Sequence, residues 1–137
     1  SVSCCRSDGL GLKRLREAGV QAFILSMEKN PVVSRRAKKL EIECFQGVND
    51  KLDVLKKETT RRGLRLDQVA FVGNDINDAD CLEAVGLPVL VGDAWPEVRA
   101  SAKWILTRNG GQGAVREFCD AVWSAKTVKQ QNKRARK

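Results

Sequence analysis

The chain contains no histidine and no tyrosine among its 137 residues. Without histidine, imidazole acid–base chemistry and Ser-His-Asp triads are excluded. A zinc site would have to be built from cysteines, but the five cysteines are odd in number and show no C-x-x-C pairing. Any chemistry must therefore rest on other side chains.

Long apolar runs are also missing. No stretch of about 18 apolar residues occurs, and the N-terminus lacks a signal-peptide pattern, so we expect no membrane partner. Cys44 and Cys81 lie in apolar patterns and are expected to be buried thiols. Together these features favour a reducing, cytoplasmic location.

The basic charge is concentrated at the C-terminal end. Residues 126–137 hold six of the 25 basic side chains and no acid, which leaves residues 1–125 at only +2 of the total +8. We expect one domain over 1–125, followed by a basic, disordered tail over 126–137. The chain has no basic stripe interleaved with aromatic residues, so we do not expect nucleic acid as a partner.

Apolar runs and helical patterns alternate along the domain. The short apolar runs predict strands at 20–25, 42–45, 68–73, 87–91 and 104–106. Helical spacing precedes the first strand, separates the strands and follows the last one, over 10–19, 31–40, 50–63, 78–86, 96–102 and 113–125. This alternation predicts an α/β fold with a mostly parallel sheet, helices on both faces and right-handed crossovers.

Local signals agree with these boundaries. Gly19, Gly63 and Gly86 stand where helices should end and are expected to adopt left-handed caps. Asn30 followed by Pro31 is typical of a helix N-cap and first turn.

In such folds ligands bind at the carboxyl ends of the strands, and two isolated polar residues stand there. Ser26 ends the first strand before a helix N-terminus, which suits a phosphoryl oxygen, although serine is also common there as a turn residue. Lys51 lies in the first turn of a predicted helix, where the macrodipole disfavours a cation. A bound anion would explain that lysine; an exposed lysine tolerated at small cost is the alternative.

The stretch "FVGNDINDAD" places Asn74, Asp75 and Asp78 after the third strand. Nearby carboxylates repel each other, and a hard cation such as Mg²⁺ would relieve the crowding. Helix capping and turn formation could account for one or two of these residues, but not for the whole group. We therefore expect a metal site built from these three residues.

A glycine-rich segment, "TRNGGQGAVRE", follows the last strand. Its backbone N–H groups, with Arg108 and Arg116 nearby, could hold an anionic substrate. We expect Arg108, Gly110, Gly111 and Arg116 to take part in substrate binding, with a plain loop as the alternative.

The order of these motifs resembles the haloacid dehalogenase superfamily of phosphotransferases. "ILS" resembles its second motif, "NDK" its third and "GNDIND" its fourth. The stretches "SDGLGLKRLREAGV", "VGLPVLVGDAWPEVRASA" and "LTRNGGQGAVREFCD" are similar to its capless branch. That branch contains the 3-deoxy-octulosonate phosphate phosphatases, related nonulosonate phosphatases and the C-terminal domains of CMP-N-acylneuraminate synthetases. The resemblance covers residues 3 to about 123.

The resemblance implies a Rossmann-like fold and a mechanism of phosphoryl transfer to an aspartate, with Mg²⁺ neutralising charge. Ser26 would hold the phosphoryl oxygens, Lys51 would balance their charge, and Asp75 or Asp78 would bind the metal. Asp8 is expected to be a helix N-cap or a substrate contact. Asn74 departs from the pattern, since the family has a carboxylate there.

The first motif of the family, a strand ending in D-x-D with the nucleophile, has no match in this sequence. The resemblance places that strand in the centre of the sheet, between the strand ending at Ser26 and the one ending at Gly73. Three outcomes are open: the two strands pair with each other, another chain fills the gap, or the chain folds poorly and associates edge to edge. We expect the last of these.

Two functions follow. The first is a Mg²⁺-dependent phosphomonoesterase acting on a phosphorylated acidic sugar, an ulosonate or nonulosonate phosphate, truncated and inactive in this chain. The alternative is a non-catalytic module that assembles a CMP-N-acylneuraminate synthetase of sialic acid metabolism into a homo-oligomer, a tetramer by resemblance.

Overall fold

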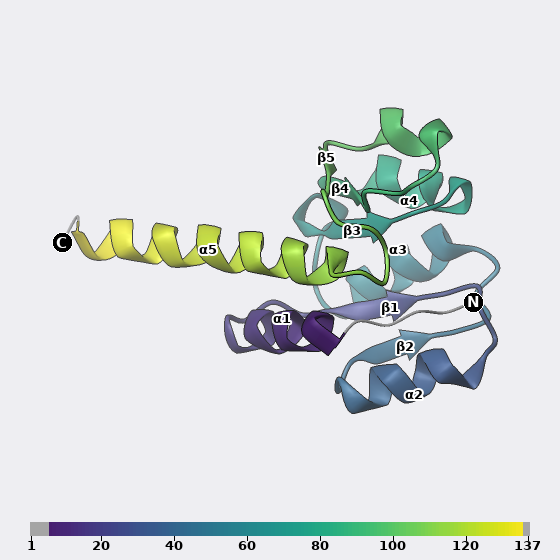
Figure 1. The fold of residues 1–137 in the computed structure, drawn as a ribbon, viewed down its shortest axis with the longest axis horizontal. Coiled ribbons are helices and arrows are strands. Elements are labelled where there is room, and N and C mark those ends of the chain that lie inside the picture. The colour runs from purple at the N-terminus through teal and green to yellow at the C-terminus, as the bar shows by residue number, and fades with distance from the viewer. Residues whose placement is uncertain (1–5, 136–137) are drawn as a thin grey trace.

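The structure, a computed structural model, describes residues 6–135 of the chain, with side chains from residue 9 onward (Figure 1). The strands are β1 (Phe23–Leu25), β2 (Glu43–Phe45), β3 (Ala70–Gly73), β4 (Leu87–Leu90) and β5 (Trp104–Ile105). The α-helices are α1 (Arg6–Glu17), α2 (Pro31–Lys39), α3 (Lys51–Arg61), α4 (Ala79–Ala84) and α5 (Ala114–Ala135). Short 3₁₀ helices form η1 (Leu66–Gln68), η2 (Ile76–Asp78) and η3 (Pro96–Ser101).

The predicted α/β fold class is confirmed, and each strand lies inside its predicted range. All strand pairs are parallel, as alternation with helices requires. The segment predicted as a helix over 96–102 is instead the 3₁₀ helix η3, with Pro96 in its first turn. Of the helix signals, the Asn30 cap is confirmed, because its side chain accepts a hydrogen bond from the Val32 N–H.

The strands form two separate sheets within the described residues. One has the order β1-β2 and the other β3-β4-β5, so β1 and β3 do not pair with each other. The outcome in which these two strands close together is therefore wrong for this structure. Helix α3 bridges the two sheets, because Leu55 belongs to one apolar cluster with Phe23 of β1 and Phe71 of β3.

A second apolar cluster surrounds the buried strand β4. Val89 and Leu90 are fully buried there, together with Leu82 of α4 and Leu106 after β5. Cys81 is buried in the α3 cluster, where desolvation first and Asp78 second raise the pKa of its thiol to about 11. The prediction of a buried thiol is confirmed for Cys81, whereas Cys44 is partly exposed.

Two of the three predicted left-handed glycines are confirmed. Gly19 and Gly63 have φ values of +86° and +70°. Gly86 does not adopt a left-handed conformation, and a different constraint acts on it. A Cβ atom at Gly86 would stand 2.1 Å from the backbone oxygen of Asp67, because the chain after α4 passes directly against η1.

We expect Gly86→Ala to lower the free energy of unfolding by about 2–3 kcal/mol, because backbone must shift to admit the methyl group. Gly110→Ala is the matched control, since the nearest atom to its new Cβ would be a Val91 side-chain atom at 3.7 Å. Urea denaturation measures both. Equal stability of the two variants would show that the Asp67–Gly86 contact is not constrained as described.

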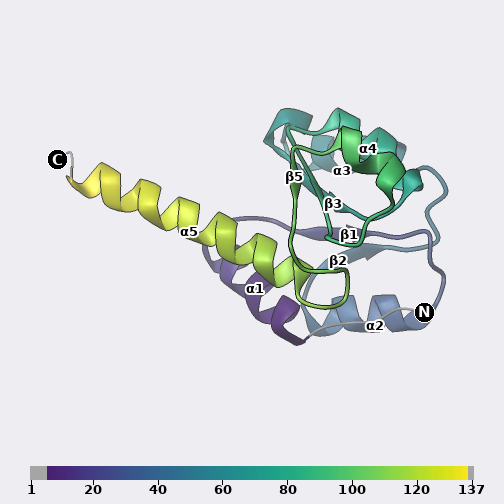
Figure 2. The ribbon, with the colours of Figure 1, turned by 45° about the horizontal axis from the view of Figure 1, so that its top comes forward.

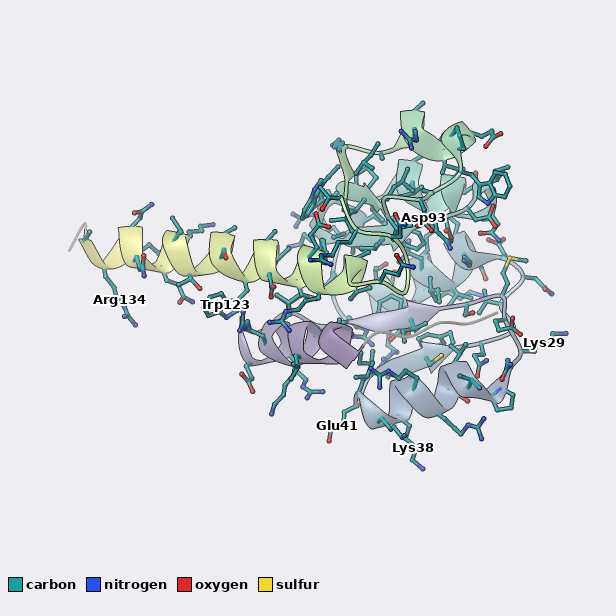
Figure 3. The ribbon with its side chains drawn as sticks, viewed as in Figure 1. Lys29, Lys38, Glu41, Asp93, Trp123 and Arg134 are labelled. Carbon is teal, nitrogen blue, oxygen red and sulfur yellow. The ribbon has the colours of Figure 1, made fainter. Side chains whose placement is uncertain are left out.

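Helix α5 continues through the segment for which we expected disorder. Its first half packs side by side with α1, and the rest extends beyond the body of the molecule, with Arg134 on the extension (Figures 1, 2 and 3). The extension contains no proline or glycine, and Lys133 and Arg134 in its last turn complement the helix macrodipole. The packed turns supply the nucleus on which these residues propagate a helix.

Deletion of residues 126–137 should change the melting temperature by no more than a few degrees, because residues 128–135 are exposed on every side. Trp123→Ala is the contrasting variant. It removes the indole ring that lies 4.7 Å from the Arg14 guanidinium of α1, so it should lower the melting temperature measurably. Thermal unfolding followed by circular dichroism compares them, and a large drop for the deletion would contradict the expectation.

Candidate phosphoryl-binding site

Three loops converge at the carboxyl ends of the strands. The Ser26 carbonyl, at the end of β1, accepts a hydrogen bond from the Val48 N–H in the loop that leads to α3. The Asn77 side-chain amide lies 3.0 Å from the Met27 sulfur, which joins the loop after β1 to the loop after β3. The two sheets share no strand pairing, yet these contacts bring their rims together.

Lys51 and Asp78 form the centre of this convergence. The Lys51 Nζ donates to Asp78 Oδ1 at 2.8 Å, and the two side chains are only 13% and 3% exposed. Asp78 Oδ2 accepts the backbone N–H groups of Asn74 and Asp75. The carboxylate therefore holds both the lysine and the turn after β3.

Gly73 makes this arrangement possible. A Cβ atom at Gly73 would lie 2.9 Å from both Cβ and Oδ2 of Asp78, closer than side-chain atoms pack. The absence of a side chain at the end of β3 lets the Asp78 carboxylate fold back beneath the turn. The sequence pattern "GNDIND" thus encodes a buried ion pair as well as a polar turn.

Asn74 and Asp75 are the other two residues of the predicted metal site. Asp75 caps η2, because its Oδ1 accepts the Ile76 N–H. Asn74 is exposed on the rim. The described residues contain no cluster of three or more acidic or cysteine side chains placed to hold a metal. Asp78, the third predicted ligand, is paired with Lys51 in this structure.

Ser26 lies at the expected place, at the end of β1 before α2. Its hydroxyl oxygen accepts the Glu28 N–H at 3.1 Å, as the turn-residue alternative predicted. Because the hydroxyl acts as acceptor in that bond, its own proton is left to donate elsewhere. The turn role and a phosphoryl-binding role are thus compatible.

The glycine-rich loop is held by carboxylates from two elements. Glu117 of α5 accepts the backbone N–H groups of Thr107 and Arg108 and the Thr107 hydroxyl, and these bonds outweigh desolvation to lower the pKa of its carboxyl. Asp93 Oδ1 accepts the Gly110 N–H. Sequence reasoning assigned no substrate-binding or metal-binding role to either acid. Asp93 bonds to a residue 17 positions away, whereas Glu117 lies at the end of the glycine-rich segment itself, 10 positions from Thr107.

The structure shows what the predicted substrate-binding residues contact. The Gly110 N–H already has an acceptor, and Gly111 adopts a left-handed conformation with φ of +73°. Arg116 donates to Asp120 and packs against Gly11 of α1. Arg108 is the exposed cation of this loop and lies close to Gly113, where an added Cβ atom would stand 3.0 Å from the arginine Cδ.

Asp8 is not the N-cap of its helix, because α1 begins at Arg6 and places Asp8 within the first turn. Its side chain lies outside the described part of the structure.

Comparison with known proteins decides the family. Residues 12–118 match the model of the haloacid dehalogenase-like hydrolases. This chain belongs to that family. The match spans the loops that carry Ser26, Lys51 and Asp78.

Individual members of the haloacid dehalogenase-like hydrolases are similar to this chain in sequence and in structure. The chain is 34% identical to the 3-deoxy-D-manno-octulosonate 8-phosphate phosphatase of Haemophilus influenzae over 86% of this chain and 66% of that protein. A putative HAD family hydrolase of Streptomyces avermitilis is 44% identical with a TM-score of 0.84, over 90% of this chain and 70% of that one.

A third relative was solved with ligands. The 3-deoxy-D-manno-octulosonate 8-phosphate phosphatase of Moraxella catarrhalis, in complex with a magnesium ion, a phosphate ion and a KDO molecule, is 31% identical with a TM-score of 0.89, over 100% of this chain and 79% of that one. The chain spans slightly under two thirds of the length of the curated relatives, 66% and 62% for the first two. No helix within residues 6–135 is long and apolar enough to cross a membrane.

Proposed function

We propose that this chain is the phosphoryl-binding part of a Mg²⁺-dependent phosphomonoesterase that acts on a phosphorylated acidic sugar, an ulosonate or nonulosonate phosphate. The observation that carries the proposal is the buried Lys51–Asp78 pair where the three loops converge. A lysine held at the start of α3 places a fixed cation at the rim, where parallel α/β folds bind ligands. The relatives named as octulosonate phosphate phosphatases support the substrate class.

Each residue of the subsite has a defined capacity. Asp78 takes one of the three N–H groups of the Lys51 ammonium, which leaves two for phosphoryl oxygens. The Ser26 hydroxyl donates its proton to another oxygen, while its own oxygen accepts from Glu28. Donors fixed before the ligand arrives stabilise the charge of a phosphoryl group most effectively.

Asn74 and Asp75 would hold the magnesium ion. They supply one amide oxygen and one carboxylate, a set that suits Mg²⁺ because this ion usually keeps several waters. With so few protein ligands we expect weak binding. The ion would neutralise phosphate charge, and Asp78 would serve it indirectly by fixing the turn on which Asn74 and Asp75 lie.

The test is ligand binding, because the aspartyl nucleophile of the family matches no residue in this sequence. We expect Ser26→Ala to weaken the affinity for inorganic phosphate about ten-fold in the presence of Mg²⁺, the effect of losing one hydrogen bond to a charged group. Ser34→Ala, on exposed α2, is the matched control.

The proposed role of Asp75 as a Mg²⁺ ligand is tested by the same kind of binding experiment. Asp75→Asn should weaken Mg²⁺ binding, whereas Asp80→Asn, an exposed acid of α4, should not. Isothermal titration calorimetry measures both ligands. Undiminished binding of phosphate by Ser26→Ala and of Mg²⁺ by Asp75→Asn would overturn the proposed function.

A second function is favoured by Asn74, the neutral residue in the first acidic position of the fourth motif. We propose as the alternative a non-catalytic module that holds a CMP-N-acylneuraminate synthetase in a homotetramer. Light scattering separates the two functions: a stable tetramer that binds neither phosphate nor Mg²⁺ supports the module, whereas binding by the wild type supports the phosphatase.

A further inference from the structure

The position of the β1-β2 sheet depends on helix α3. No strand pairing joins β1-β2 to β3-β4-β5 within the described residues. Leu55 packs against β1 and β3, but apolar contact is non-directional, so it permits the small sheet to rotate on the helix. The Asn77–Met27 contact joins the two sheets at one end of the strands, so a directional contact at the other end is needed to fix that rotation.

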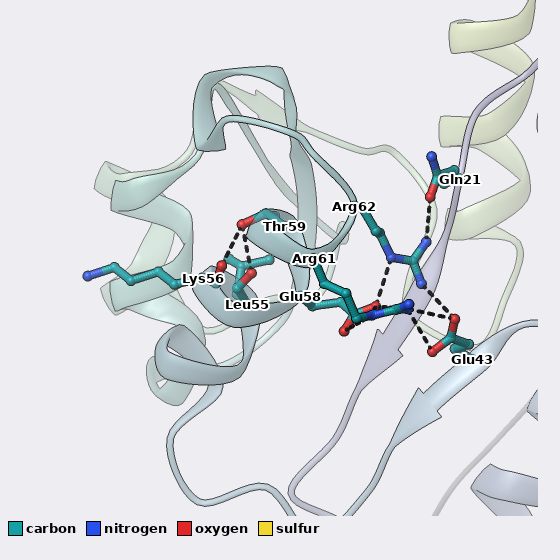
Figure 4. A network of polar contacts seen from close by, with 8 residues as sticks. All are labelled: Gln21, Glu43, Leu55, Lys56, Glu58, Thr59, Arg61 and Arg62. Carbon is teal, nitrogen blue, oxygen red and sulfur yellow. Dashed lines mark hydrogen bonds and ion pairs between the residues drawn. The ribbon is translucent and has the colours of Figure 1, made fainter.

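A polar network at the far end of α3 supplies this contact (Figure 4). Glu58, which is 5% exposed, accepts hydrogen bonds from Arg61 and from Arg62 Nε at 2.9 Å. Arg62 also donates to Gln21, which precedes β1, and to Glu43, the first residue of β2, at 3.0 and 3.3 Å. One guanidinium therefore touches α3 and both chain segments of the small sheet.

The network is satisfied throughout and stays charged. Arg62 is 10% exposed and its guanidinium lies 4.7 Å from the centre of the Phe23 ring on β1. The hydrogen bond from Arg61, followed in size by opposing desolvation and then by Arg62, brings the pKa of Glu58 to about 2. Because this pKa lies below the usual value, the contact is intact at neutral pH and is lost only as the pH falls through about 2.

The network and the phosphoryl subsite lie at opposite ends of the same elements. Lys51 begins α3 and Arg61 ends it, a separation of roughly 15 Å at 1.5 Å per residue. Ser26 ends β1, whose first residue packs against Arg62. A rotation of the small sheet at the network would move Ser26 relative to Lys51.

We propose that Glu58 and Arg62 are positioning residues that lock the β1-β2 sheet onto α3 and so set the distance between Ser26 and Lys51. The proposal rests on the proposed function, because it treats Ser26 and Lys51 as one phosphoryl subsite. The network would thus affect phosphate binding although it lies at the opposite end of α3 and β1 from the phosphoryl subsite.

Amide hydrogen exchange is the first test. Arg62→Met should lower the protection of Ile24 and Ser26 at least about ten-fold more than that of Phe71 and Val89, because the small sheet opens on its own. Arg65→Met is the matched control, since Arg65 forms an exposed pair with Asp67 outside the network. An equal loss in both sheets would mean general destabilisation and would overturn the proposal.

Phosphate affinity is the second test. Glu43→Gln, at a half-exposed residue, weakens the network without burying an unpaired charge, so this variant should fold and bind inorganic phosphate at least about five-fold more weakly. Unchanged affinity in both Glu43→Gln and Arg62→Met would overturn the positioning role. If the wild type binds no phosphate, the proposed function fails, while the exchange contrast still decides whether the network locks the sheet.

Discussion

Asp78→Ala is expected to lower the free energy of unfolding by roughly 3–5 kcal/mol, the usual cost of removing one partner from a buried ion pair. The variant leaves the Lys51 ammonium, 13% exposed, without its anion. It also removes the acceptor of the Asn74 and Asp75 N–H groups, so the turn after β3 loses its support. Urea denaturation at neutral pH measures the change.

The exposed pair Lys57–Asp53 provides the control for this prediction. Its side chains are 76% and 53% exposed, so Asp53→Ala should cost no more than about 1 kcal/mol, apart from any effect on helix α3. The double variant Lys51→Met, Asp78→Ala should be more stable than the sum of the single effects predicts, because it leaves no unpaired charge. Strict additivity would show that the two side chains do not interact as the distance indicates.

The second large effect is expected in hydrogen exchange along β1 and β3. Strand residues alternate in direction, and Ser26 N–H donates to Phe45 of β2, so Ile24 also faces β2 while Phe23 and Leu25 face away from it. On β3, Gly73 and Val69 carbonyls accept from β4, so Ala70 and Val72 face the opposite edge. Those outward amides line the gap between the two sheets.

We expect the amides of Leu25 and Val72 to exchange at nearly the rate of an unfolded chain, while Ile24 and Phe71 in the same strands are protected at least about a hundred-fold. Nuclear magnetic resonance at several protein concentrations measures this. Protection of Leu25 and Val72 that rises with concentration would show another chain pairing with these edges. Strong protection in a monomer at every concentration would contradict the separate sheets and indicate that β1 and β3 pair directly.

Much of the fold could be predicted from local sequence. The apolar runs gave the five strands because buried parallel strands are continuously apolar, and Asn30–Pro31 gave the start of α2 because capping is a contact between near neighbours. Ser26, Lys51 and the Asn74–Asp78 turn were found for a similar reason. Parallel strands place their carboxyl ends at one rim, so the order of motifs along the chain predicts their meeting in space.

The tertiary structure decided what those residues contact. Asp78 as a metal ligand stays a prediction, but the structure also pairs it with Lys51, 27 residues away, and local spacing carries no signal for a pair at that distance. Position 86 must be glycine because η1 passes against it and leaves no room for a side chain. No turn rule reveals this contact. The same holds for Asp93, which bonds to Gly110 of the glycine-rich loop 17 residues away, and for the extension of α5, whose helix propagates from turns packed on α1. Sequence alone determined the elements and the rim at which polar groups gather, because these depend on periodicity and on neighbours in the chain. The partners of each charge were decided by packing between distant segments, since the energy of a buried charge depends on what surrounds it in space.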